Sequence, residues 1–238
     1  MILQSIDPSR ILTIFIPQLI VASIFLFIAV KLLIRNRPRP IITLSMVYFF
    51  TAFGLIFNAI FIVIAAFIPD NVLLLQILYL FTFFPMLFSP IFILTFIVSI
   101  LKLEFIFTIK KQLIITIIYG FVNCLIFFIP NGITFTEQWR PIYSWTFFMC
   151  IYIFFTVCIV IPTMIYSRRL IKTFQDKILK KKLVTFIIGV FGMYLILYGA
   201  VLYITWQDPL FRSVWVVITF FLMISSAIFI YYGIGREL

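Results

Sequence analysis

Side chains that usually perform catalysis or bind metals are scarce in this chain of 238 residues. Histidine is absent, which removes the commonest general base and the commonest metal ligand. The three cysteines, Cys124, Cys150 and Cys158, lie inside apolar runs, where we interpret them as small buried hydrophobic residues. We therefore expect no catalytic residue, no metal site, no cofactor and no enzymatic activity.

Uncharged polar residues within the apolar runs are the remaining candidates for a ligand site. They are Asn58, Thr82, Ser89 and Asn123. Thr82 and Ser89 share one helix face, and Pro85 lies between them on that face. Proline leaves a backbone carbonyl without its helical donor, so that carbonyl needs a partner from the protein or from water in a cavity. The pattern predicts either an uncharged pocket or a set of hydrogen bonds between helices.

The composition decides which kind of molecule holds these residues. Hydrophobic residues make up 65% of the chain and charged residues 11%, against about 45–50% and about 25% in soluble domains. These values exclude a soluble enzyme and a nucleic-acid-binding module, although the formal net charge is +11. They indicate an integral membrane protein.

Apolar runs long enough to cross a bilayer predict an all-α membrane protein, a single seven-helix bundle over residues 1–238. The predicted spans are about 11–34, 41–68, 73–101, 112–129, 142–166, 183–205 and 210–232. No Asp, Glu, Lys or Arg lies in the middle of these runs. We expect the third span to be kinked, because Pro85 and Pro90 interrupt it.

Basic residues predict the orientation of the bundle. On the predicted topology, 15 of the 18 Lys and Arg residues fall on one side of the membrane. The positive-inside rule then places the N-terminus outside and the C-terminus inside. We expect a multi-pass protein of the plasma membrane whose first run is retained as a span and is not removed as a signal peptide.

Two further features are expected to make contacts. The loop over residues 167–182 carries a net charge of +6, which favours contact with anionic headgroups of the inner face or with a cytoplasmic protein. Its expected contact residues are Arg168, Arg169, Lys172, Lys180, Lys181 and Lys182. The sixth predicted span carries a stripe of small residues, Gly189, Gly192 and Gly199, that is typical of close helix packing.

The end of the chain resembles the exit of the seven-helix sensor region of prokaryotic histidine kinases. In that family the last helix closes with a Tyr-x-Ile-x-Arg-like pattern, matched here by Tyr232, Ile234 and Arg236. The seven spans and the outside N-terminus are also similar. The family's chains normally continue into a cytoplasmic output domain, whereas this sequence stops at Leu238. The resemblance therefore implies a sensor that signals through a separate protein.

Three functions follow as expectations. The first is a sensor or receptor-like protein that binds an apolar or uncharged ligand and signals to a cytoplasmic partner. The second is a facilitative carrier of a small uncharged solute, built as two parallel three-helix repeats around a central helix. The third is a non-catalytic subunit of a membrane complex.

Overall fold

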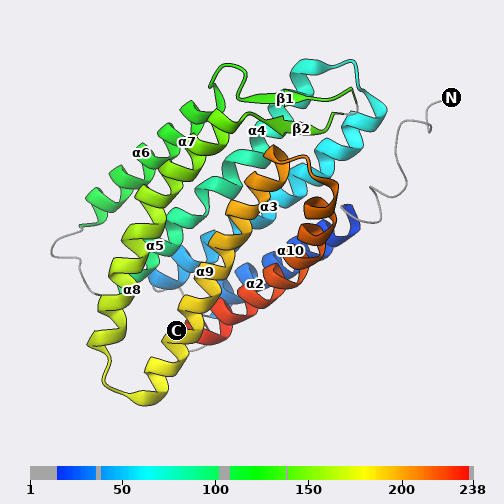
Figure 1. Cartoon of the computed structure of the whole chain (residues 1–238). Coiled ribbons are helices and arrows are strands. Elements are labelled where there is room, and N and C mark those ends of the chain that lie inside the picture. Colours follow the sequence, from blue (N-terminus) through cyan, green and yellow to red (C-terminus); the bar gives the residue numbers. More distant parts are fainter. Residues whose placement is uncertain (1–14, 36–38, 102–107, 138, 236–238) are drawn as a thin grey trace.

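The computed structural model describes residues 15–35, 39–101, 108–137 and 139–235, and these residues form a bundle of long helices (Figure 1). Within these described residues, seven helical stretches are long and apolar enough to cross a membrane. The helical elements are α2 (Ile16–Arg35), α3 (Arg39–Phe67), α4 (Val72–Phe88), α5 (Pro90–Ile100), α6 (Ile109–Phe127), α7 (Trp145–Phe155), η3 (Thr156–Val160), α8 (Ile161–Thr173), α9 (Lys177–Thr205), α10 (Pro209–Ile230) and η4 (Tyr231–Gly235). The predicted all-α bundle of seven spans is confirmed.

The two ends of the bundle differ in character. One end carries a short β-hairpin and is called the hairpin end; the other carries the turn between α8 and α9 and is called the basic end (Figure 1).

The charged residues Lys31 and Arg212 lie within spanning helices, but each is close to a helix end. Arg37, Lys102 and Arg236 fall outside the described residues.

The third span is interrupted at one of its two prolines. Pro85 lies inside α4, and the helix passes through it. The break comes at Ser89, immediately before Pro90 opens α5. Pro90 supplies no backbone donor, so the Met86 carbonyl, four residues earlier, loses its helical partner.

A β-hairpin joins α6 to α7, and its second strand covers residues 142 and 143, which we expected to begin the fifth span. Strand β1 (Ile133–Phe135) pairs antiparallel with β2 (Pro141–Tyr143). The Trp139 indole donates a hydrogen bond of 3.0 Å to the Pro69 carbonyl, which ties the hairpin to the turn between α3 and α4. Below it, the Tyr143 and Tyr79 hydroxyls lie 2.5 Å apart. Burial raises the pKa of Tyr143 well above its usual range, so this side chain stays protonated.

Close contact between α9 and α10 depends on glycine. A Cβ atom at Gly189 would lie 2.8 Å from the Ser226 carbonyl oxygen and 2.9 Å from the Ile230 nitrogen, both of the α10 backbone. A Cβ at Gly199 would overlap the Trp215 ring, and one at Gly192 would overlap the Ser226 hydroxyl. The predicted stripe of small residues thus faces α10 along most of its length.

Candidate functional site

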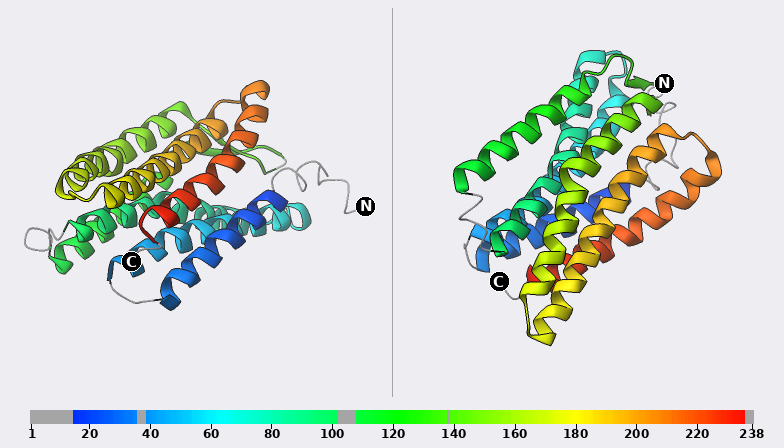
Figure 2. Two further views of the ribbon diagram at one scale, coloured as in Figure 1. Left: turned by 90° about the horizontal axis from the view of Figure 1, so that it is seen from below. Right: turned by 60° about the vertical axis from the view of Figure 1, so that its left-hand side comes forward.

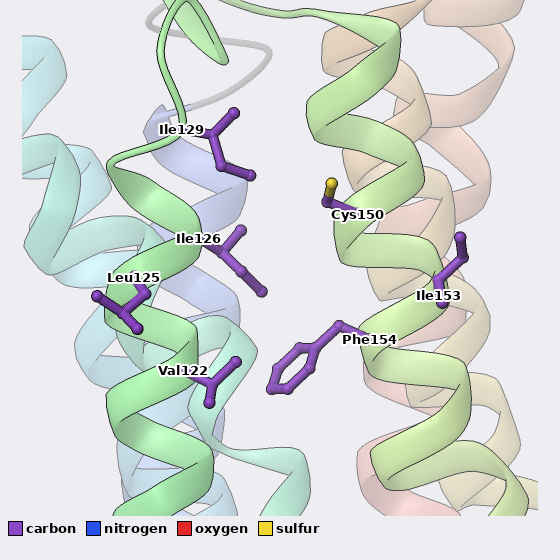
Figure 3. A pocket seen from close by; sticks show the side chains of 7 residues that line it. All are labelled: Val122, Leu125, Ile126, Ile129, Cys150, Ile153 and Phe154. Carbon is purple, nitrogen blue, oxygen red and sulfur yellow. The ribbon is translucent and has the colours of Figure 1, made fainter.

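An apolar groove lies between α6 and α7 in the half of the bundle nearest the hairpin (Figure 3). Its volume is about 490 Å³, and it is shallow and open on one side. Its lining residues are Val122, Leu125, Ile126 and Ile129 on one side and Cys150, Ile153 and Phe154 on the other. Ile126 is only 8% exposed and forms the floor, whereas Leu125 and Ile153 are 52% and 60% exposed. The groove therefore opens sideways, toward the surface that faces lipid.

Aromatic packing holds the two walls of the groove apart. The Phe83 ring of α4 contacts Phe127 of α6 and Phe147 of α7, with ring centroids 6.2 Å and 5.7 Å away. The Phe83 ring thus lies between α6 and α7 at the hairpin end and separates them. Toward the basic end, the Tyr119 ring of α6 stacks on Phe154 at 5.0 Å. In Figure 3 the Phe154 side chain points from α7 across toward α6.

Local capping sets where the two walls begin and end. The Ser144 hydroxyl accepts a hydrogen bond of 3.2 Å from the Phe147 nitrogen, which fixes the first turn of α7. At the other wall, α6 ends at Phe127, and Asn131 takes a positive φ of 53° in the turn that follows. The Ser144 nitrogen donates to the Gly132 carbonyl at 3.0 Å, so the two helix ends are joined through the base of the hairpin.

None of the four predicted ligand-site residues lines this groove, and the structure places them in separate contacts between or within helices. The Asn58 amide donates to the Gln18 side chain of α2 at 2.9 Å. The Thr51 hydroxyl donates to the Ser89 hydroxyl at 3.1 Å, at the break between α4 and α5. Thr82 donates to the Leu78 carbonyl within its own helix, at 3.1 Å.

Asn123 of α6 forms a hydrogen bond to the backbone of α4. Its Nδ2 atom donates to the Phe84 carbonyl at 3.2 Å, and its Oδ1 atom is buried with no hydrogen-bond partner. One turn earlier on α6, the Tyr119 hydroxyl donates to the Leu87 carbonyl at 2.7 Å. Tyr119 and Asn123 thus both make hydrogen bonds between α6 and α4, which is the second of the two arrangements that the sequence left open.

Tyrosine–threonine pairs are polar features that the sequence reasoning did not single out. The Tyr194 hydroxyl of α9 lies 2.9 Å from the Thr163 hydroxyl of α8. The Tyr198 hydroxyl pairs with Thr156, the first residue of the π-helical turn η3. A tyrosine in an apolar run gives no signal of its own, although Pro162 marks this region as irregular.

The predicted basic residues gather at the turn between α8 and α9. Arg168, Arg169 and Lys172 lie on α8 with exposed side chains. Lys180, Lys181 and Lys182 lie on α9, where Lys180 and Lys181 are exposed and Lys182 is half-buried. Figure 2 shows this turn reaching beyond the other helices at the basic end.

The chain was compared with protein-family models, with curated proteins and with solved structures, and it has a match in none of them. Among the described residues, no three His, Cys, Asp or Glu side chains lie close enough together to hold a metal ion. The fold itself defines the class: this is an integral, multi-pass membrane protein with seven spanning helices.

Proposed function

We propose that this protein is a sensor or receptor-like membrane protein that binds an apolar, lipid-like ligand in the groove between α6 and α7. The observation that carries the proposal is the lining of that groove, which consists of aliphatic side chains, one phenylalanine and one thiol. Such a lining offers dispersion contacts and no charge, so it suits a hydrocarbon chain or another apolar group. Because the groove opens sideways, the ligand enters from the membrane.

The orientation of the bundle determines which leaflet supplies the ligand. The positive-inside rule places the basic end in the cytoplasm and the hairpin end outside. Under this orientation the groove lies in the outer half of the membrane. A separate cytoplasmic protein then detects the change at the basic end.

Phe154 connects the groove to two irregular parts of the bundle. Its ring stacks on Tyr119, whose hydroxyl holds the Leu87 carbonyl beside the break between α4 and α5. The next residue, Phe155, contacts the Tyr194 and Tyr198 rings of α9 at 5.3 Å and 5.2 Å. A ligand that displaces Phe154 would therefore act on α4–α5 and on α9, both of which extend to the basic end.

Native mass spectrometry of the gently solubilised protein tests the proposal, with Val122→Trp as the groove-filling variant. The wild-type protein is expected to retain a small apolar molecule, and Val122→Trp is expected to lose it. Val217→Trp is the matched control, because Val217 lies on α10 and is 57% exposed. Equal retention by all three proteins would contradict the groove site. A stoichiometric protein partner without any small molecule would favour the subunit function instead.

A further inference from the structure

We infer that the turn between α8 and α9 is a docking surface for an acidic protein surface that has an apolar site at its centre. This inference names the cytoplasmic partner of the proposed function and rests on that function for its biological meaning. Its physical basis is separate, because it depends on the length of two helices and on what their ends expose. The surface consists of Lys172, Lys177, Ile178 and Lys180 and is called the turn surface.

Helix length places the turn surface beyond the membrane. The exposed indoles of Trp145 and Trp206, 56% and 47% accessible, mark the membrane boundary at the hairpin end. From Trp206 back to Ile178, α9 rises about 42 Å at about 1.5 Å per residue. The hydrocarbon core is about 30 Å thick, and the polar layer adds about 5–7 Å on each side. Even with a tilt of about 20°, Ile178 lies past the headgroups.

The cations of this region therefore fall into two layers. With the same rise per residue and the same tilt, Arg168 on α8 and Lys182 on α9 lie about 2–4 Å beyond the core, which is headgroup depth. Lys172, Lys177 and Lys180 lie about 7–11 Å beyond it, at or past the outer edge of the headgroups. Headgroups can satisfy the first layer, whereas the second layer faces the aqueous phase. A soluble partner is the occupant that can reach the second layer.

An exposed apolar side chain distinguishes the turn surface from a general basic patch. Ile178 is 69% exposed, and Lys177 precedes it directly on the first turn of α9. The hydrocarbon core is too far away to cover Ile178, so water surrounds it until a partner binds. The neighbouring carboxylate of Asp176 accepts a hydrogen bond of 2.9 Å from the Ile178 nitrogen and caps α9. The three lysines thus present an excess of positive charge around one apolar side chain.

A complementary partner carries carboxylates around an apolar recess or lies as an amphipathic helix with acidic and leucine-bearing positions. Anionic lipid offers the charge but not an apolar contact at this height. The two occupants consequently differ in how they respond to a change at Ile178. Replacing Ile178 by serine leaves the charge unaltered and removes only the apolar contact.

The test uses the full chain in phosphatidylcholine nanodiscs and a fluorescein-labelled amphipathic peptide of glutamate and leucine, with affinity read from fluorescence anisotropy. Lys177→Glu and Ile178→Ser are each expected to weaken binding by about tenfold or more. Lys110→Glu is the matched charge reversal at the same end but outside the turn surface, and it is expected to retain affinity. Equal weakening by Lys110→Glu, or unchanged affinity for Ile178→Ser, would overturn the inference.

A second measurement decides between protein and lipid. An environment-sensitive fluorophore on Lys177→Cys, with the three native cysteines replaced by alanine, is compared in phosphatidylcholine and phosphatidylserine nanodiscs. The turn surface is expected to stay in water in both, with an unchanged emission maximum. A shift to apolar emission in phosphatidylserine would show that lipid covers the turn and would overturn the inference. Neither measurement requires a groove ligand, so failure here leaves the groove proposal to its own test.

Discussion

Tyr119 and Asn123 show how single side chains on α6 stabilise an irregular neighbour. Both donate to carbonyls of α4, Tyr119 to Leu87, two residues before the break, and Asn123 to Phe84, one turn earlier. Each bond joins α6 to α4 between two spanning helices, where polar side chains commonly stabilise helix packing. The same Tyr119 ring also closes one end of the groove against Phe154.

Replacing Tyr119 by phenylalanine is expected to lower the free energy of unfolding by about 1 kcal/mol. The ring and its stacking remain, while the Leu87 carbonyl loses its side-chain donor. The measurement is reversible unfolding in mixed micelles. Tyr152→Phe serves as the control, because Tyr152 is 44% exposed. If the two variants are equally stable, the Tyr119 hydroxyl does not support the break.

At the residue scale, the sequence identified polar side chains but not their partners. Pro85 and Pro90 predicted freed carbonyls, and Asn123 was predicted as a candidate ligand-site residue, whereas its partner, the Phe84 carbonyl of α4, was not foreseen. The donor Tyr119 was missed, because its distance from Leu87 depends on how α6 packs against α4. The groove was missed for a similar reason. Its lining residues are the commonest apolar types, and they form a groove because Phe83 packs between α6 and α7 and separates the two helices.

At the element scale, the glycines of α9 determine how closely two helices approach. Gly189→Ala is expected to destabilise the protein by about 1–3 kcal/mol, because the added methyl group meets backbone atoms of α10 that cannot move aside. Gly120→Ala is the matched control on α6, since the atoms nearest its added methyl group belong to the Phe88 side chain and not to the backbone. Thermal unfolding of the two variants checks this. A larger loss for Gly120→Ala would contradict the account.

The Trp139 indole anchors the tip of the hairpin to the turn between α3 and α4. Trp139→Phe removes the bond from the indole to the Pro69 carbonyl while keeping an aromatic ring beside Phe135. We expect hydrogen exchange across residues 133–143 to become about 5–30-fold faster, which corresponds to about 1–2 kcal/mol of local stability. Trp145→Phe, at an exposed position on α7, is expected to leave exchange unchanged. Faster exchange in both variants would indicate a general loss of the fold.

Spanning helices were predictable as elements because long apolar runs have one stable form in a bilayer. The strands β1 and β2 were not, since each has three residues, too few for a period of two to stand out in the sequence. The π-helical turn η3 was also missed. It arises from a shift in backbone bonding, with the Ile161 nitrogen bonded to the Thr156 carbonyl, and such a shift leaves no mark on apolar periodicity.

For the whole molecule, the orientation in the membrane remains a prediction from charge. In cells expressing a protein without native cysteines, a membrane-impermeant maleimide is expected to label Glu137→Cys at the hairpin end. Gln175→Cys, in the turn between α8 and α9, is expected to react only after permeabilisation. The reverse pattern would place the groove in the inner leaflet and the basic end outside.

Occupation of the groove by an apolar ligand is the central claim, and photo-crosslinking in proteoliposomes tests it most directly. A diazirine-bearing fatty-acyl lipid is added, and the labelled residues are mapped by mass spectrometry. The account predicts labels concentrated on residues 122–129 and 150–154, reduced by excess unreactive lipid and lost in Val122→Trp. Labels spread evenly over the exposed faces of other helices, such as Val217 and Phe221 on α10, would contradict it.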